Sequence, residues 1–269
     1  MRFVYPDGKR KALTFSYDDG QAFDKRLTSI FNEYGLKGTF HLNSGTLGVE
    51  RGKDIYVRPD EVARIYKGHE VACHGVQHRN PPILTPAQWA AEVGDDRKAL
   101  ERLTGYMVQG LSYAFGNYSE EVKSTARALG IKYSRTVKST GNFFPPADFM
   151  EWHPTCHHSE SLLELGDQFL DVPGYYELPV MYVWGHSFEF GWPDDWSVIE
   201  AFAKKMSGKE DIWYAANREI CDYIQAVRNQ EFSADALTMH NPCAISVWVG
   251  TQNGIVEVKA GKTEYIGER

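Results

Sequence analysis

The sequence predicts an α/β protein, and we expect a distorted TIM-like (β/α)7 barrel followed by a short C-terminal β extension. Short apolar, β-prone runs alternate with helical patterns seven times between residues 11 and 229. After residue 232 the pattern changes to alternating strand patterning with Asn-Gly and Ala-Gly-Lys turn signals. Successive β/α units form a parallel sheet, either an incomplete TIM-like barrel or an open doubly wound sheet. Of the two, we expect the barrel over residues 1–232, with residues 233–269 packed on the same domain.

The predicted units follow one another closely over the first half of the chain. Residues 11–17 form an apolar strand, and residues 23–35 carry apolar side chains at helical spacing up to a Gly35 stop. The next three units are predicted, as strand and then helix, at 38–43 and 58–68, 69–75 and 84–105, and 106–116 and 119–130. Thr85, Pro86 and Gln88 specify the start of the third helix, because they have the spacing of a capping box.

The pattern is interrupted once in the second half. A fifth strand is predicted at 131–137, and a long loop rich in Pro, His and aromatic residues follows at 138–160. The remaining elements are a helix at 159–170, a strand and helix at 177–186 and 194–206, and a strand and helix at 211–215 and 217–229. A loop as long as the one at 138–160 tends to be functional when it lies inside a compact domain.

Composition narrows the class of partner. The 269 residues carry a net charge of −7 and no basic run, which argues against nucleic acid or an anionic membrane as the main partner. The N-terminus lacks an apolar segment of signal-peptide length, so we expect a cytoplasmic protein. The four cysteines are far apart and form no C-x-x-C pair, which predicts free thiols: Cys73, Cys156, Cys221 and Cys243. The sequence indicates no oligomeric state.

Two short motifs bring metal-binding residue types to predicted strand ends. "CHGVQH" contains His74 and His78, which a helical turn after the third strand would place on one side. Alone, this spacing is common in solvated or structural histidines, and "DDG" alone is common in turns. Together, two histidines and an aspartate form a set that leaves positions open for water and substrate. If one acid of the pair Asp18 and Asp19 binds the metal, the other is free to act as a base. This requires the chain to bend at the pair, which Gly20 permits.

These motifs resemble those of the polysaccharide deacetylase (NodB-homology) family of carbohydrate esterases. "TFSYDDG" at 14–20 resembles Thr-Phe-Asp-Asp-Gly with two residues inserted, and "HGVQH" at 74–78 resembles His-(Ser/Thr)-x-x-His. The resemblance implies that Asp18 is the catalytic base and that Asp19, His74 and His78 bind a divalent metal. We expect zinc first, although such a set also accepts Co, Ni, Mn or Fe.

Two weaker motifs extend the resemblance along residues 10–230. "SYAFG" at 112–116 is similar to Arg-x-Pro-(Tyr/Phe)-Gly, which implies that the Phe115 backbone N–H stabilises an oxyanion. "WGH" at 184–186 is similar to Leu-x-His, which implies that His186 is the general acid. Ser112 stands where the family has the arginine that orients the base, and Ala114 replaces the proline. Arg135, at the end of the fifth strand, is a candidate substitute cation.

Four further residues are candidates for substrate contact or support. The family's fourth motif survives at most as "DFMEW", with Trp152 the equivalent of its tryptophan. His157 lies in the long loop, where a partly exposed loop histidine is an equally good interpretation. Glu189 and Trp192 follow directly after His186.

The function predicted from these residues is that of a metal-dependent hydrolase. It would remove an N-acetyl group from an acetylated sugar or polysaccharide. The alternative keeps the same chemistry but acts on a small cyclic imide, a ureide or a formyl-sugar amide. A third hypothesis, from a different class, is a non-catalytic carbohydrate-binding relative.

Overall fold

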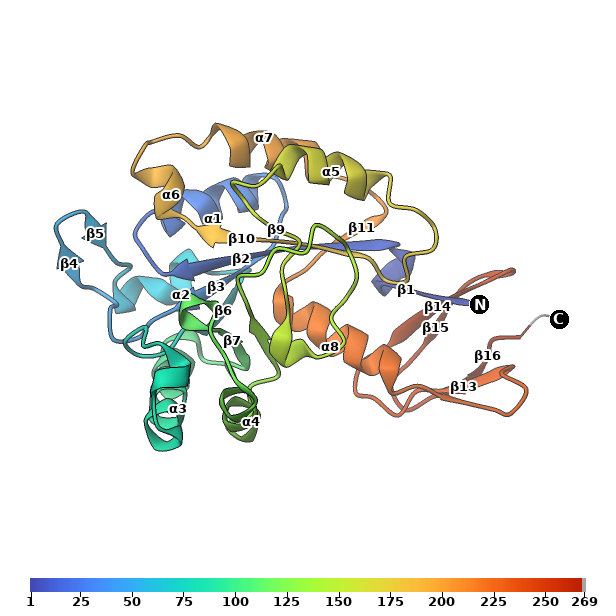
Figure 1. Ribbon diagram of the computed structural model, residues 1–269. Coiled ribbons are helices and arrows are strands. Elements are labelled where there is room, and N and C mark those ends of the chain that lie inside the picture. The colour runs from blue at the N-terminus through green and yellow to red at the C-terminus, as the bar shows by residue number, and fades with distance from the viewer. Residues whose placement is uncertain (268–269) are drawn as a thin grey trace.

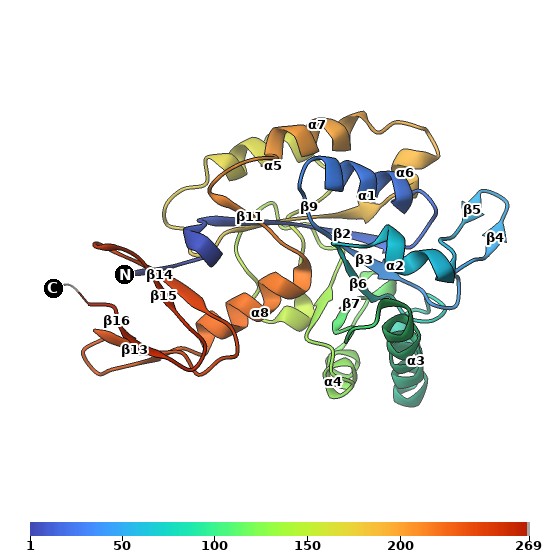
Figure 2. The ribbon, with the colours of Figure 1, turned by 180° about the vertical axis from the view of Figure 1, so that it is seen from behind.

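The computed structural model describes residues 1–267 and has the predicted α/β fold. A parallel sheet with the strand order β8-β7-β6-β3-β2-β10-β9 curls through the molecule, and β11 also pairs with β2 (Figure 1). Helices α1, α5 and α7 lie on one side of this sheet, and α3, α4 and α8 lie on the other (Figures 1 and 2). The curled sheet confirms the expected barrel-like class and excludes the flat, open alternative.

The secondary structure agrees with the predicted order of elements. The strands of the curled sheet are β2 (Lys11–Asp19), β3 (Gly38–Leu42), β6 (Glu70–Cys73), β7 (Gly110–Ser112), β8 (Tyr133–Arg135), β9 (Cys156–His157), β10 (Val180–His186) and β11 (Ile212–Tyr214). The helices are α1 (Asp24–Glu33), α2 (Val62–Ile65), α3 (Pro86–Thr104), α4 (Glu120–Ala128), α5 (Leu162–Leu170), α6 (Phe188–Gly191), α7 (Ser197–Met206) and α8 (Asn217–Arg228). The Thr85–Gln88 capping box is present at the start of α3.

The segment from Trp152 to His157 differs most from its prediction as a loop. Trp152 forms a parallel bridge with Arg135 at the end of β8, and β9 pairs in parallel with β10. This segment therefore joins the two ends of the curled sheet. Strand β11 corresponds to the predicted seventh strand. It pairs with the first residues of β2, on the same edge of β2 where β3 pairs with the later residues.

Strand β2 separates an apolar face from a polar one. Leu13, Phe15 and Tyr17 are fully buried in the main apolar core. The alternate residues lie on the opposite face of the strand. There Thr14 donates a hydrogen bond to Asn217 at the start of α8, and Asp18 pairs with Arg135. The polar interior of the barrel thus ends in Asp18 at the carboxyl end of its longest strand.

The C-terminal residues form small antiparallel sheets at the end of the molecule that also carries the N-terminus (Figures 1 and 2). These strands are β1 (Arg2–Val4) with β14 (Val247–Thr251) and β15 (Gly254–Val258), and β12 (Glu231–Phe232) with β13 (Thr238–His240) and β16 (Thr263–Tyr265). Because β1 pairs with β14, the two ends of the chain share one sheet. The division of the chain at residue 232 stays a prediction.

A few short elements complete the description. A hairpin of β4 (Glu50–Arg51) and β5 (Asp54–Ile55) projects from the opposite end of the molecule (Figure 1). Single 3-10 turns occur at Pro6–Gly8, Pro59–Glu61, Pro81–Ile83, Ala114–Gly116 and Phe149–Glu151. All four cysteines are free thiols, as expected. Within residues 1–267, no helix is long and apolar enough to cross a membrane.

Candidate active site

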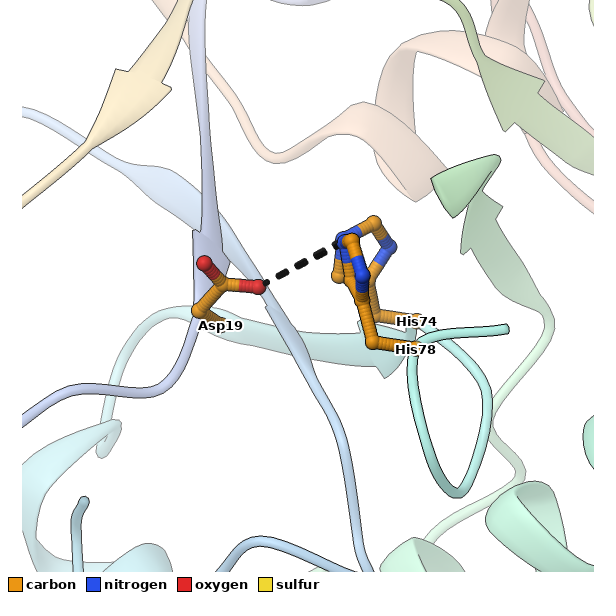
Figure 3. Close-up of side chains that lie close together, drawn as sticks. All are labelled: Asp19, His74 and His78. Atoms are coloured by element: carbon orange, nitrogen blue, oxygen red, sulfur yellow. Dashed lines mark ion pairs between the residues drawn. The ribbon is translucent and has the colours of Figure 1, made fainter. Parts of the chain in front are cut away.

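Asp19, His74 and His78 converge at the carboxyl ends of β2 and β6. The Oδ1 atom of Asp19 lies 3.6 Å from His74 Nε2 and 3.9 Å from His78 Nε2. Figure 3 shows the carboxylate facing the two imidazoles, which come from the loop after β6. The structure therefore brings together the three residues that the two motifs predicted as metal ligands. Whether they bind a metal stays a prediction.

The backbone at two of these residues has a positive φ angle, which residues other than glycine rarely adopt. Asp19 has φ +77° and His78 has φ +53°. Such strained residues cluster at functional sites, where the surrounding structure holds them in place. The expected bend therefore begins at Asp19, one residue before Gly20, which also has a positive φ of 69°.

The segment that carries both histidines is a loop, so the expected helical turn is wrong. Asp96 on α3 holds this loop, because its Oδ2 accepts the backbone N–H groups of His74 and Gly75, both at 3.0 Å. Glu92, one turn earlier on α3, accepts the N–H of Gln77. Burial raises the pKa of Asp96 to about 6, although the hydrogen bonds act to lower it.

Sequence reasoning missed Asp96 and Glu92. The available signal was that both acids share the buried face of α3 with Trp89, Val93 and Leu100. A carboxyl group on such a face needs a polar partner. The spacing of His74 and His78 was informative, but the structural reason for their proximity is this anchored loop.

The protonation state of the His74 imidazole is the one that a metal ligand needs. Its Nδ1–H donates to the carbonyl oxygen of Ser112 at 2.9 Å, so the lone pair lies on Nε2, which is 3.6 Å from both Asp19 Oδ1 and Asp18 Oδ2. A hydrogen bond of this kind orients most metal-binding histidines. Burial lowers the pKa of His74 to about 3, against the opposing charge of Asp18, so the imidazole is neutral as metal binding requires.

Asp18 has a different environment from its neighbour. It is 2% exposed and forms an ion pair with Arg135, which is itself fully buried. Its other carboxylate oxygen accepts a hydrogen bond from Ser112 Oγ at 3.2 Å. Burial acts to raise the pKa of Asp18, but the positive charge of Arg135 outweighs it and holds the pKa well below its usual range. Asp18 is therefore an anchored, ionised carboxylate.

His186 lies beside Asp18, because the two residues are register partners across β10 and β2. Its Nδ1 is 3.2 Å from Oε2 of Glu189, one turn away on α6. Burial acts to lower the pKa of His186, but the hydrogen bond to Glu189 and the charge of Asp18 raise it above its ordinary value. The structure thus gives His186 a carboxylate that favours its protonated form.

Comparison with known proteins gives a family match over the first half of the chain. Residues 5–134, which carry Asp18, Asp19 and both histidines of the loop, match the family described as polysaccharide deacetylase. Residues 5–134 are therefore similar to the polysaccharide deacetylase family. The Bacillus subtilis protein YxkH, a polysaccharide deacetylase by name, is 22% identical over 130 residues, which are 48% of this chain and 45% of that protein. The match therefore spans just under half the length of this curated relative.

Two solved structures show the same fold over most of the chain. A Mycobacterium smegmatis protein, a polysaccharide deacetylase by name, has a TM-score of 0.62 at 18% identity and covers 85% of this chain and 95% of its own. Puue allantoinase has a TM-score of 0.61 at 13% identity, with 81% of this chain and 91% of that chain covered. At such low identities the likeness concerns the fold.

Arg135, the candidate substitute for the arginine that the resemblance expects at Ser112, lies on the next strand. Ser112 and Arg135 are register partners across β7 and β8. The cation that the resemblance places at position 112 is therefore found at the same level of the barrel, one strand further along. Arg135 stacks over Trp184, with 4.3 Å between its guanidinium carbon and the ring centre, and donates to the carbonyl of Thr136 at 2.9 Å.

The remaining predicted residues lie around this centre. Phe115 is 61% exposed, has φ +60° and places its ring 4.6 Å from that of His78. Trp192 is partly exposed on the side of His186, where it packs on Phe188, and the Lys53 ammonium lies 3.4 Å from its ring centre. Trp152 is 1% exposed and packs in the core, so its place is support for Arg135 rather than contact with a ligand.

Proposed function

We propose that this protein is a metal-dependent hydrolase that removes an N-acetyl group from an acetylated sugar or polysaccharide. The observation that carries the proposal is the division between two adjacent carboxylates. Asp18 is held by Arg135 and Ser112 and lies 3.6 Å from His74, whereas Asp19 faces both His74 and His78. The match of residues 5–134 to the polysaccharide deacetylase family supports the reaction class.

The donor set of Asp19, His74 and His78 suits a divalent metal of the zinc type. Bound there, the metal would supply Lewis-acid polarisation of the amide carbonyl and would acidify water. The remaining steps are assigned to residues of this chain. Asp18 takes the proton of the attacking water, and its ion pair with Arg135 fixes the carboxylate in place.

The other two roles fall to residues on either side of the carboxylates. The Phe115 backbone N–H stabilises the oxyanion, on the side of the site where its ring contacts His78. His186 carries the proton for the leaving nitrogen, and Glu189 keeps the imidazole oriented and favours the charged form. Phe115, Phe188 and Trp192 provide apolar contact area for the substrate around the centre.

A second candidate is ring-opening hydrolysis of a small cyclic ureide. Ser112 stands where the resemblance expects an arginine, and the buried Arg135 pairs with Asp18 instead. The fold shared with an allantoinase is compatible with this alternative.

The test is a comparison of two substrate classes with the same purified chain. The metal-stripped protein is assayed with N-acetylglucosamine monomers and oligomers for acetate release, and with allantoin for ring opening, with and without added Zn²⁺. We expect metal-dependent acetate release. Ring opening without acetate release would favour the second candidate, and no turnover of either class by the zinc-loaded protein would favour a non-catalytic binding protein.

A further inference from the structure

A second cluster of metal-binding side chains lies on the His186 side of the barrel. It consists of His157 at the end of β9, His158 directly after it, and Glu189 on α6. Oε2 of Glu189 is 3.1 Å from His157 Nε2 and 3.4 Å from His158 Nε2. These residues share no member with the Asp19, His74 and His78 set.

Two of the three separations between these donor atoms are close to those around a bound zinc ion. Ligands at about 2.0–2.1 Å in tetrahedral geometry lie roughly 3.3–3.4 Å from one another. The two distances to Glu189 fall close to this value, and all three donors lie within 4.8 Å of one another. The corresponding distances in the Asp19 set are longer, at 3.6 and 3.9 Å.

The cluster is also held in place by its surroundings. His158 is 4% exposed and its ring packs between Tyr17, stacked at 12°, and Phe190, with 4.1 Å between ring centres. Gly185 makes room for it, because a Cβ there would lie 2.0 Å from His158 Nδ1. His157 Nδ1 lies 2.7 Å from Ser159 Oγ and accepts the Ser159 backbone N–H at 3.3 Å, and these two contacts hold the imidazole ring in place.

The cluster has access to solvent on one side. The Glu189 side chain is 34% exposed and that of His157 is 13% exposed. A cation can therefore enter, and water can complete its coordination, as in sites with three protein ligands. Two imidazoles and one carboxylate favour Zn²⁺ over Ca²⁺ or Mg²⁺, which prefer oxygen ligands.

We propose that His157, His158 and Glu189 bind a second divalent cation of the zinc type, separate from any metal bound by Asp19, His74 and His78. Because Glu189 Oε2 also contacts His186 Nδ1, this second site adjoins the residue assigned as general acid. The proposal concerns binding alone, so it holds or fails independently of the hydrolytic function.

The test counts zinc ions per chain. The metal-stripped full-length protein is titrated with Zn²⁺ in a calorimeter, and bound zinc is measured by elemental analysis after removal of free ions. We expect two ions in the wild type, one in each of Glu189→Gln and His157→Ala, and one in His78→Ala. His153→Ala, which removes a histidine of the same loop outside the cluster, should retain two. Circular dichroism confirms that each variant is folded.

Two results would overturn the second site. One is a wild-type protein that binds a single zinc ion, lost in His78→Ala and retained in Glu189→Gln. The other is a Glu189→Gln or His157→Ala variant that binds as many ions as the wild type. Failure of the proposed hydrolysis would appear only in the acetate assay and would leave these counts unchanged.

Discussion

Replacing Arg135 should destabilise the protein far more than replacing an exposed arginine. Arg135 and Asp18 are 0% and 3% exposed at their side chains, so Arg135→Met leaves a carboxylate buried without its charge partner. Removing one partner of a buried pair costs about 3–5 kcal/mol. Arg127 provides the control, because its ion pair with Asp148 is 47% and 39% exposed and such pairs contribute within about 1 kcal/mol.

A double-mutant cycle separates this charge effect from lost packing on Trp184. In Asp18→Asn combined with Arg135→Met, neither charge is left buried and unpaired, so the double variant should lose less stability than the sum of the two single changes. The assay is urea unfolding at pH 7, with free energies of unfolding compared among the four proteins. Additive losses, or an Arg135→Met variant within 1 kcal/mol of the wild type, would refute the account of the pair.

Three further predictions follow from other buried contacts. Burial raises the pKa of Glu70 from its ordinary value of 4.5 to about 7. Between these two pH values the folded protein holds a proton that the unfolded chain has released. The Glu70 carboxyl therefore lowers the free energy of unfolding as the pH rises through this range. Glu70→Gln should therefore flatten the decline in unfolding free energy from pH 5 to pH 8, and an unchanged urea-unfolding profile would contradict this. Asp96→Asn should weaken zinc binding about 10–100-fold, because His74 and Gly75 lose a charged acceptor; equal affinities in a chelator competition would argue against that. Gly185→Ala should lower the unfolding free energy by about 1–3 kcal/mol, because its Cβ meets the His158 ring, and a variant as stable as the wild type would show that the ring moves freely.

The sequence predicted the position of the site because polar residues at strand ends are local features. Asp18, Asp19 and His186 lie within or at the ends of strands whose apolar pattern is clear. In a parallel sheet those ends meet at one edge, which also explains why Arg135 could be chosen as a substitute cation. The Thr85–Gln88 cap was predictable for the same reason, since all of its contacts lie within four residues.

The features that could not be predicted depend on contacts between distant segments. The pairing of residues 152–157 with both β8 and β10 is invisible in a segment that is rich in histidine and interrupted by Pro154. The loop at 74–78 depends on Asp96, about 20 residues away in sequence. The contacts of Glu189 with His157 and His158 likewise require β9 and α6 to meet, which no local pattern indicates.

The central claim is that two adjacent carboxylates have different tasks, and a matched pair of variants tests it most directly. Bound zinc and acetate release from N-acetylglucosamine oligomers are measured for Asp18→Asn and Asp19→Asn, in the His157→Ala background so that only one metal site is counted. The account predicts that Asp18→Asn retains one zinc ion and releases no acetate, whereas Asp19→Asn loses zinc as well. Acetate release at the parent rate by Asp18→Asn, or equal loss of zinc in both variants, would contradict it.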